Sequence, residues 1–309
     1  MPTSLPPLDR LPLQWQSFHT QADINVAQVY VRVHADVDLQ PYWDAGWRLT
    51  GDIYGPQCRR SHTLPARYTF EDQGPGSSFL AQAILPDPCF WSDQVPSLYQ
   101  ATWQLSPPQE TTIQQQALLG LRSLAIKNRQ LILNTEAWEF RAASIRRLNN
   151  WSVEQYHEHS LVMILEQPDS SLLKEASELG TWVAAVLSGD EDAICEQLVQ
   201  MAAWPAVCMA IIRSPIETPE RLRQAAPNLI LGQWLQDPSD LPSTHWSQLL
   251  FCEANTPETF SAYTEGCSLP LIAVRSGNDM SSAADVSEAF QLFKSSFDQD
   301  QLPAGYAII

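Results

Sequence analysis

Acidic residues at the ends of short apolar runs are the first residues of this sequence that could do chemistry. Glu166 and Glu253 each lie at the end of such a run, and Glu217 stands in the turn after a third run. Two carboxyl groups can cleave a glycosidic bond when they are about 5 Å apart in retaining enzymes, or about 6.5 to 9.5 Å apart in inverting ones. The acids therefore indicate glycoside hydrolysis, provided that two of them meet.

Basic and aromatic residues occupy similar positions. Arg146, Arg213 and Arg275 lie at or near the ends of apolar runs, and Trp234 lies within another run. Cations at such places oppose an oxocarbenium-like transition state, because positive charge develops there. The arginines can instead pair with the acids in a structural network, or bind an anionic ligand. Trp234 can stack on a sugar ring or fill the core.

The segment 206–220 indicates which elements hold these residues. The apolar run 206–213 is too short for an independent helix and is typical of a strand buried on both faces. Thr218 then has the side chain of an N-cap, Pro219 suits the first helical position, and Glu220 complements the helix dipole. A strand, a turn and a helix form half of a βαβ unit, whose functional residues lie past the carboxyl end of the strand.

This unit repeats along the C-terminal part of the chain. Helix starts with Asp169, Asp190, Thr218, Thr256 or the pair 281–282 separate the apolar runs, and Gly180 and Gly266 are placed as helix C-caps. The runs are 139–147, 161–166, 181–188, 206–213, 229–235, 248–254, 269–276 and 304–309. A hairpin around Lys127 and Asn128 precedes them. We therefore expect residues 118–309 to form a compact (β/α)8 barrel with a leading hairpin.

The N-terminal part has the pattern of an all-β domain. Short strand-like runs alternate with turn-rich pieces, and Val29, Val31 and Val33 alternate with polar residues. We expect residues 1–117 to form an immunoglobulin-like sandwich whose aromatic residues fill the core or form a sugar-stacking platform. The polar segment 106–116 is either a connection between domains or the edge of a hairpin.

Three segments resemble glycoside hydrolase family 2, which includes β-galactosidases, β-glucuronidases and β-mannosidases. CFWSDQVPSLYQATWQL (89–105) is similar to the family's "W-S-P-x-x-P-x-L-Y" signature at the end of its immunoglobulin-like domain. GLRSLAIKNRQLILNTEAWEFRAASIRR (120–147) resembles the start of the barrel, and PDSSLLKEASELGTWVAAV (168–186) resembles its second helix and third strand. The resemblance implies a sandwich followed by a barrel, and hydrolysis of O-glycosidic bonds.

The same resemblance implies that the catalytic residues are missing. The family's acid/base glutamate follows an asparagine at the end of strand four, where this chain has Ser214 and Pro215. The family's nucleophile ends strand seven, where this chain has Arg275. Glu166 and Glu253 end the second and sixth runs, so we expect them on opposite sides of the barrel, unless their side chains converge. A loop shift that brings Glu217 into the site is the alternative. The family's N-terminal jelly roll is also absent from the sequence given.

Composition excludes several other classes. A net charge of -17 and a pI of about 4.6 disfavour nucleic acid and anionic membrane surfaces. The sequence has no leader peptide or long apolar span, so we expect a cytoplasmic protein with its six cysteines reduced. His157 and His159 have no third ligand nearby in the sequence, and no nucleotide-binding glycine motif occurs. We expect neither a metal nor a cofactor.

The sequence thus predicts a family 2-like pseudoenzyme that has lost hydrolysis and binds a carbohydrate, an acidic small molecule, a protein partner or a second copy of itself. An active glycosidase with relocated carboxylates is the alternative. The candidate ligand-lining residues are Arg146, Glu166, Arg213, Glu217, Trp234, Glu253 and Arg275.

Overall fold

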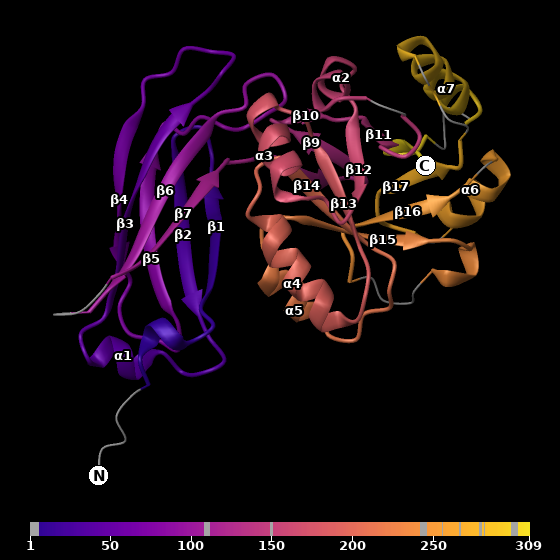
Figure 1. Cartoon of the computed structure of the whole chain (residues 1–309). Helices are drawn as coiled ribbons and strands as arrows, with labels where there is room; N and C mark the ends of the chain where they lie inside the picture. The colour runs from indigo at the N-terminus through magenta and orange to yellow at the C-terminus, as the bar shows by residue number, and fades with distance from the viewer. Residues whose placement is uncertain are drawn as a thin grey trace. The chain divides into compact units, whose positions relative to one another are not determined.

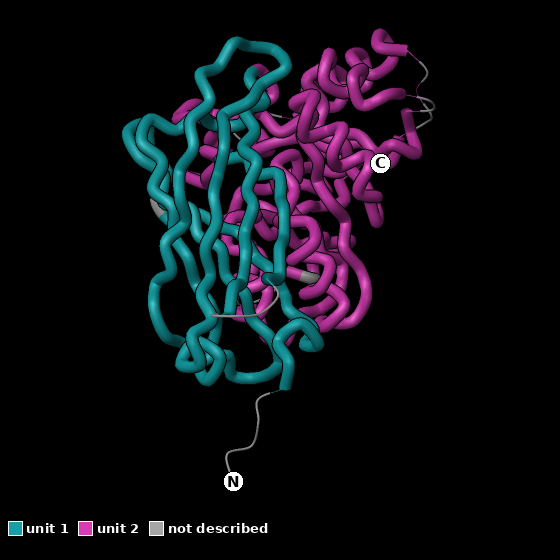
Figure 2. The backbone as a smooth tube through the Cα atoms, turned by 60° about the vertical axis from the view of Figure 1, so that its left-hand side comes forward, with its two compact units in different colours: residues 1–91, 95–121 teal, residues 92–94, 122–309 magenta. Residues whose placement is uncertain are grey.

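The chain folds into two compact units. The computed structural model describes residues 6–107, 112–148, 151–241, 246–254, 256–265, 267–277, 280, 282–297 and 302–309. Unit 1 comprises Met1–Trp91 and Val95–Leu121, and unit 2 comprises Ser92–Gln94 and Arg122–Ile309 (Figure 2).

Unit 1 is an antiparallel β-sandwich, as the sequence predicts. Its seven strands follow the order β1-β2-β5-β4-β3-β6-β7 (Figure 1). β4 joins the two halves of the sandwich, because its first residues pair with β3 and its last two pair with β5. The strands are β1 Gln14–Ala22, β2 Val26–His34, β3 Arg48–Gln57, β4 Ala66–Asp72, β5 Phe79–Pro86, β6 Leu98–Ser106 and β7 Ile113–Leu119, with the short helices η1 Leu8–Arg10 and α1 Gln40–Asp44 at loops.

Alternating side chains build the core of unit 1. The valines of β2 are buried and their neighbours are partly exposed. Trp103 is buried at the centre, 6.1 Å from Phe70 and 6.3 Å from Trp15 between ring centroids. These aromatic residues therefore fill the core. The segment 106–116 ends in β7, which pairs with β6 as a hairpin edge; residues 108–111 lie outside the described part.

The hairpin predicted before the barrel belongs to a small three-stranded sheet. β8 Leu124–Lys127 pairs with β9 Gln130–Leu133, and β10 Glu136–Ala137 extends the sheet. Asn128 and Arg129 join the first two strands with φ of 51° and 63°. Positive φ at both central residues is the backbone of a type I′ turn, whose twist matches that of the strands.

Unit 2 contains the closed parallel barrel that the sequence predicts (Figure 1). The barrel strands β11–β18 pair in chain order, and β18 pairs with both β17 and β11. The strands are β11 Phe140–Ser144, β12 Val162–Glu166, β13 Val183–Leu187, β14 Val207–Ile212, β15 Ile230–Leu235, β16 Leu249–Glu253, β17 Leu271–Arg275 and β18 Gly305–Ile308. The connecting helices are α2 Val153–Glu158, α3 Ser170–Leu179, α4 Glu191–Ala202, α5 Pro219–Ala225, η2 Pro238–Asp240, α6 Pro257–Thr264 and α7 Ala283–Ser295.

Side-chain caps begin most of these helices. Asp169, Asp190, Thr256 and Ser282 each accept a hydrogen bond from the backbone N–H three residues later. Thr218 occupies the N-cap position of α5, but its side chain makes no capping hydrogen bond, which corrects the sequence expectation. Gly180 ends α3 with a φ of 83°, as predicted, whereas Gly266 and Ser281 lie outside the described residues.

Aromatic rings fill the barrel interior and set where small residues must stand. Phe140 on β11 and Phe251 on β16 meet across the barrel with ring centroids 5.8 Å apart. A Cβ at Gly305 would lie 2.4 Å from the backbone oxygen of Phe140, and one at Gly232 would lie 3.1 Å from the Phe251 ring. The missing side chains of Gly305 and Gly232 therefore allow β18 to pack against β11, and β15 against β16, beside these rings.

A buried arginine, Arg122, lies at the amino end of β14. The Nη1 group of Arg122 donates hydrogen bonds to the backbone oxygens of Trp204, Pro205 and Val207. Burial lowers the pKa of Arg122 to about 10, because the charged form loses its hydration. Arg122, which precedes the hairpin, thus fixes the amino end of β14, opposite to the end where catalytic residues lie in barrels of this kind.

The six cysteines are free thiols, and Cys208, Cys252 and Cys267 are buried. Among the residues that the structure describes, no helix is both long and apolar enough to cross a membrane.

Candidate ligand site at the barrel mouth

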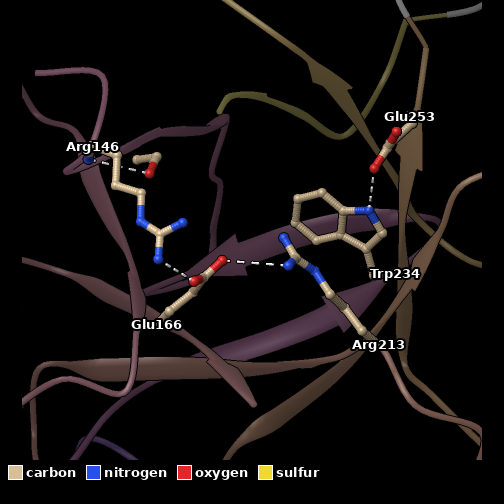
Figure 3. A network of polar contacts seen from close by, with 6 residues as sticks. Arg146, Glu166, Arg213, Trp234 and Glu253 are labelled. Atoms are coloured by element: carbon tan, nitrogen blue, oxygen red, sulfur yellow. Dashed lines mark hydrogen bonds and ion pairs between the residues drawn. The ribbon is translucent and has the colours of Figure 1, made fainter. Parts of the chain in front are cut away.

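The carboxyl ends of β11–β18 carry a group of charged side chains, and this end of the barrel is called the barrel mouth below. Glu166, the last residue of β12, lies between two arginines (Figure 3). Its Oε2 accepts a hydrogen bond from Nη2 of Arg146 at 2.7 Å, and its Oε1 accepts one from Nη1 of Arg213 at 3.3 Å. The side chains of Arg146, Glu166 and Arg213 are 73%, 39% and 41% exposed, so the ion pairs face solvent.

Trp234 on β15 supports Arg213 from the neighbouring strand. The guanidinium carbon of Arg213 lies 4.4 Å from the centroid of the Trp234 ring, within cation–π distance. On the next strand, Phe251 stacks on Trp234 with centroids 6.0 Å apart and ring planes 6° from parallel. Trp234 is only 5% exposed. The indole therefore packs between its neighbours and presents no open face on which a sugar ring could stack.

Glu253, the last residue of β16, fixes the other edge of the indole. Its Oε1 accepts a hydrogen bond from Nε1–H of Trp234 at 2.8 Å, and its backbone oxygen accepts one from the Tyr263 hydroxyl at 3.4 Å. Arg213 and Trp234 consequently stand between the carboxylates of Glu166 and Glu253 (Figure 3). The network differs from the one expected, since Glu253 is bound by an indole rather than by an arginine.

Arg275 does not join this group. Val274 is the register partner of Glu253, so the two side chains share a side of the sheet, and Arg275 points the other way. Its guanidinium lies 5.8 Å from the ring centroid of Phe293 on α7. Arg275 therefore packs against the outer helix and not over the mouth.

Glu217 also lies away from this group, in a loop held at both ends. The Ser214 hydroxyl donates to the backbone oxygen of Gly189 at 3.0 Å. The carboxylate of Glu191 on α4 accepts the N–H groups of Glu217 and Thr218 at 3.0 and 3.1 Å. The side chain of Glu217 is exposed and makes no hydrogen bond or ion pair with another described residue.

Glu191 holds the loop that follows β14, and the sequence did not single out this residue. Hydrogen bonds from the Thr218 hydroxyl and from the two backbone N–H groups, together with the charge of Arg221, lower the pKa of Glu191. On α5, Nη1 of Arg221 lies 3.7 Å from Oε1 of Glu191, and its Nη2 lies 2.6 Å from Oδ1 of Asp192. Nothing in the local pattern separates Glu191 from an ordinary first-turn acid, because the loop that it binds lies on the next βα unit.

Hydrogen bonds and ion pairs engage three of the four carboxylate oxygens of Glu166 and Glu253. Each oxygen of Glu166 is already bound by a guanidinium, and one oxygen of Glu253 is bound by the indole. Guanidinium groups stay protonated in proteins and are therefore not general acids or bases. Two arginines that converge on one carboxylate, as Arg146 and Arg213 do on Glu166, have the donor geometry that binds an anionic group.

The histidine pair shows no metal-binding arrangement. His157 Nδ1 lies 3.2 Å from the backbone oxygen of Gly180, and His159 is exposed beside Trp151, with ring centroids 5.1 Å apart. Within the described ranges, no three His, Cys, Asp or Glu side chains lie together as potential ligands of a metal ion.

Comparison with known proteins gives a match in structure but not in sequence. No family model matches the chain, and no curated protein matches it. Solved structures of β-glucuronidases match the chain in fold. Bacteroides uniformis β-glucuronidase 2 bound covalently to cyclophellitol-6-carboxylate aziridine gives a TM-score of 0.64 at 12% identity. The enzymes of Bifidobacterium dentium and Dictyoglomus thermophilum give TM-scores of 0.64 and 0.60, each at 11% identity.

These alignments cover 96% of this chain, but 45%, 60% and 61% of the three enzymes in the order named. The chain therefore spans about half the length of the structures that it resembles. At such low identity the likeness establishes the fold alone: a sandwich and a (β/α)8 barrel arranged in the chain order of these β-glucuronidases.

Proposed function

We propose that this chain is a glycoside hydrolase family 2-like protein that binds a carbohydrate at the barrel mouth without hydrolysing it. The observation that carries the proposal is the engagement of both mouth acids: Glu166 is bound by Arg146 and Arg213, and Glu253 is bound by Trp234. A glycosidase needs one carboxyl group to protonate the leaving oxygen and another to attack or to activate water. These acids are instead committed to the network.

The loop after β14 supports the same conclusion. A shift of Glu217 toward the barrel axis would have to break the bonds that Glu191 makes to its backbone and that Ser214 makes to Gly189. In addition, a guanidinium at the end of strand four, where Arg213 stands, would repel the positive charge that develops at the anomeric carbon. These contacts favour binding over the alternative of a glycosidase that uses Glu166, Glu217 or Glu253 as relocated carboxylates.

Hydrolysis is tested with purified protein and the p-nitrophenyl β-glycosides of glucuronic acid, galactose and mannose. We expect release of p-nitrophenol at the rate of the buffer blank, with a working β-glucuronidase assayed in parallel as the positive control. Turnover that Glu217→Gln, Glu253→Gln or Glu166→Gln abolishes would show an active glycosidase and overturn the proposal.

Binding is tested with a panel of neutral and acidic monosaccharides, monitored by tryptophan fluorescence, since Trp234 contacts Arg213 in the mouth. We expect at least one sugar to bind the wild type and to bind Arg213→Gln more weakly. If no sugar binds, the carbohydrate proposal fails, and a protein-interaction role takes its place.

A further inference from the structure

In the barrel mouth, the carboxylate of Glu166 lies where two arginines of the same chain could bind an anion. Each oxygen of Glu166 receives one guanidinium N–H, from Arg146 at 2.7 Å and from Arg213 at 3.3 Å. This is the pairing that arginines make with the carboxylate of a bound ligand. The side chain of Glu166 is 39% exposed, so this acid faces solvent.

The two arginines differ in how firmly they are held. Arg213 rests on Trp234, which is itself fixed by Phe251 and by the Glu253 carboxylate. Its guanidinium is thus pre-organised, and less entropy is lost when it binds a second group. Arg146 follows β11 and is 73% exposed, so its side chain extends into solvent and is free to change rotamer.

We propose that Glu166 is an internal competitor for the ligand: the mouth selects a sugar that carries a carboxylate, and this group replaces Glu166 on Arg213 and Arg146. The inference rests on the proposed carbohydrate binding and adds the class of ligand. Arg213 provides the fixed cation and Arg146 the movable one. A neutral sugar cannot make this exchange, because its hydroxyl groups do not offset the loss of the Glu166 ion pairs.

The charge balance explains why an internal acid is needed. Without Glu166, Arg146 and Arg213 would place two cations together, with mutual repulsion and no bound anion. With Glu166 present, both guanidinium charges are neutralised in the absence of ligand. A ligand then binds only if its own anionic group replaces the ion pairs that the Glu166 carboxylate loses. The exchange therefore favours acidic sugars over neutral ones, and Glu166 lowers the affinity for acidic sugars alone, because only their carboxylate competes for the same two arginines.

The test uses galacturonate, galactose and acetate as probes, titrated into the whole chain at low salt with calorimetric or fluorescence detection. We expect galacturonate to bind the wild type more tightly than galactose or acetate. Glu166→Gln keeps the side-chain shape and removes the competing charge, so the affinity for galacturonate should rise about tenfold, while that for galactose changes little.

Arg213→Gln should lower the affinity for galacturonate by about tenfold or more. Arg213→Lys keeps the charge but loses the planar guanidinium, and we expect an intermediate loss that also serves if the glutamine variant folds poorly. Glu217→Gln is the matched control, because it removes one acid from an exposed position outside the network, and it should leave all three affinities unchanged.

The outcomes separate this inference from the proposed function. If galacturonate and galactose bind with equal affinity, and Glu166→Gln changes neither affinity, the proposed exchange with Glu166 is wrong. Carbohydrate binding would still stand. Binding of neither sugar to any variant would overturn both. Acetate bound as tightly as galacturonate would show a general anion site and contradict selection of a sugar.

Discussion

The replacement of Gly305 by alanine tests how the barrel closes. Gly305 begins β18 and is the register partner of Phe140 on β11, so it lies where the last strand meets the first. A Cβ at this position would lie 2.4 Å from the Phe140 backbone oxygen, 2.5 Å from its Cβ and 3.0 Å from its Cα. Two of these atoms belong to the backbone, so a side-chain rotation cannot relieve the clash.

The expected cost follows from two opposing effects. Overpacking a well-filled interior costs about 1 to 3 kcal/mol, and the upper end applies here because β18 itself must move away from β11. Replacing glycine by alanine also restricts the unfolded chain and returns about 0.4 to 1 kcal/mol, since the φ of Gly305 is not positive. We expect a net loss of about 2 kcal/mol in the free energy of unfolding of unit 2.

Hydrogen–deuterium exchange with peptide resolution measures this loss separately in the two units. A loss of about 2 kcal/mol corresponds to roughly 30-fold faster exchange of the amides in β11 and β18. The β1–β7 amides should be unaffected. Gly76→Ala is the control, because the nearest atom to the added Cβ is the Ser78 backbone oxygen at 3.4 Å, an ordinary contact. Unchanged protection of β11 and β18 in Gly305→Ala would refute the view that close contact with Phe140 requires glycine.

Two further predictions concern pH. Burial raises the pKa values of Tyr99 and Tyr306 to about 12, so their contribution to stability is complete below pH 10 and is lost as the pH rises toward 12. Tyr306→Phe should therefore reduce the fall of the urea midpoint at alkaline pH. An unchanged dependence of the urea midpoint on pH would contradict this contribution of Tyr306. The lowered pKa of Glu191 means that its hold on the loop is present above about pH 4.5 and lost as pH falls below it. Glu191→Gln should therefore speed amide exchange at Glu217 and Thr218 several-fold at pH 6, whereas equal rates in both proteins would contradict its positioning role.

The sequence predicts which elements exist because local patterns encode them. Each of the eight apolar runs corresponds to a barrel strand, and the capping residues at 169, 190 and 256 begin helices as expected. That Ser214, Pro215 and Arg275 stand where glycoside hydrolase family 2 has its catalytic carboxylates follows from the resemblance in sequence and stays a prediction.

Side-chain direction is what the sequence left open. Strands buried on both faces, such as β14 and β17, lack the polar alternation that would mark the inner side. The sequence therefore placed Arg213 and Arg275 together, whereas the register turns Arg213 toward Glu166 and Arg275 toward Phe293.

The composition and periodicity of this chain determined a sandwich followed by an eight-stranded barrel, and also the residue types available at each strand end. Only the tertiary structure decided that Glu166 is held by two arginines, that Trp234 is covered, and that Glu191 binds the loop after β14. The physical reason is distance along the chain: these contacts join different βα units, and their geometry depends on how the closed sheet aligns its strands.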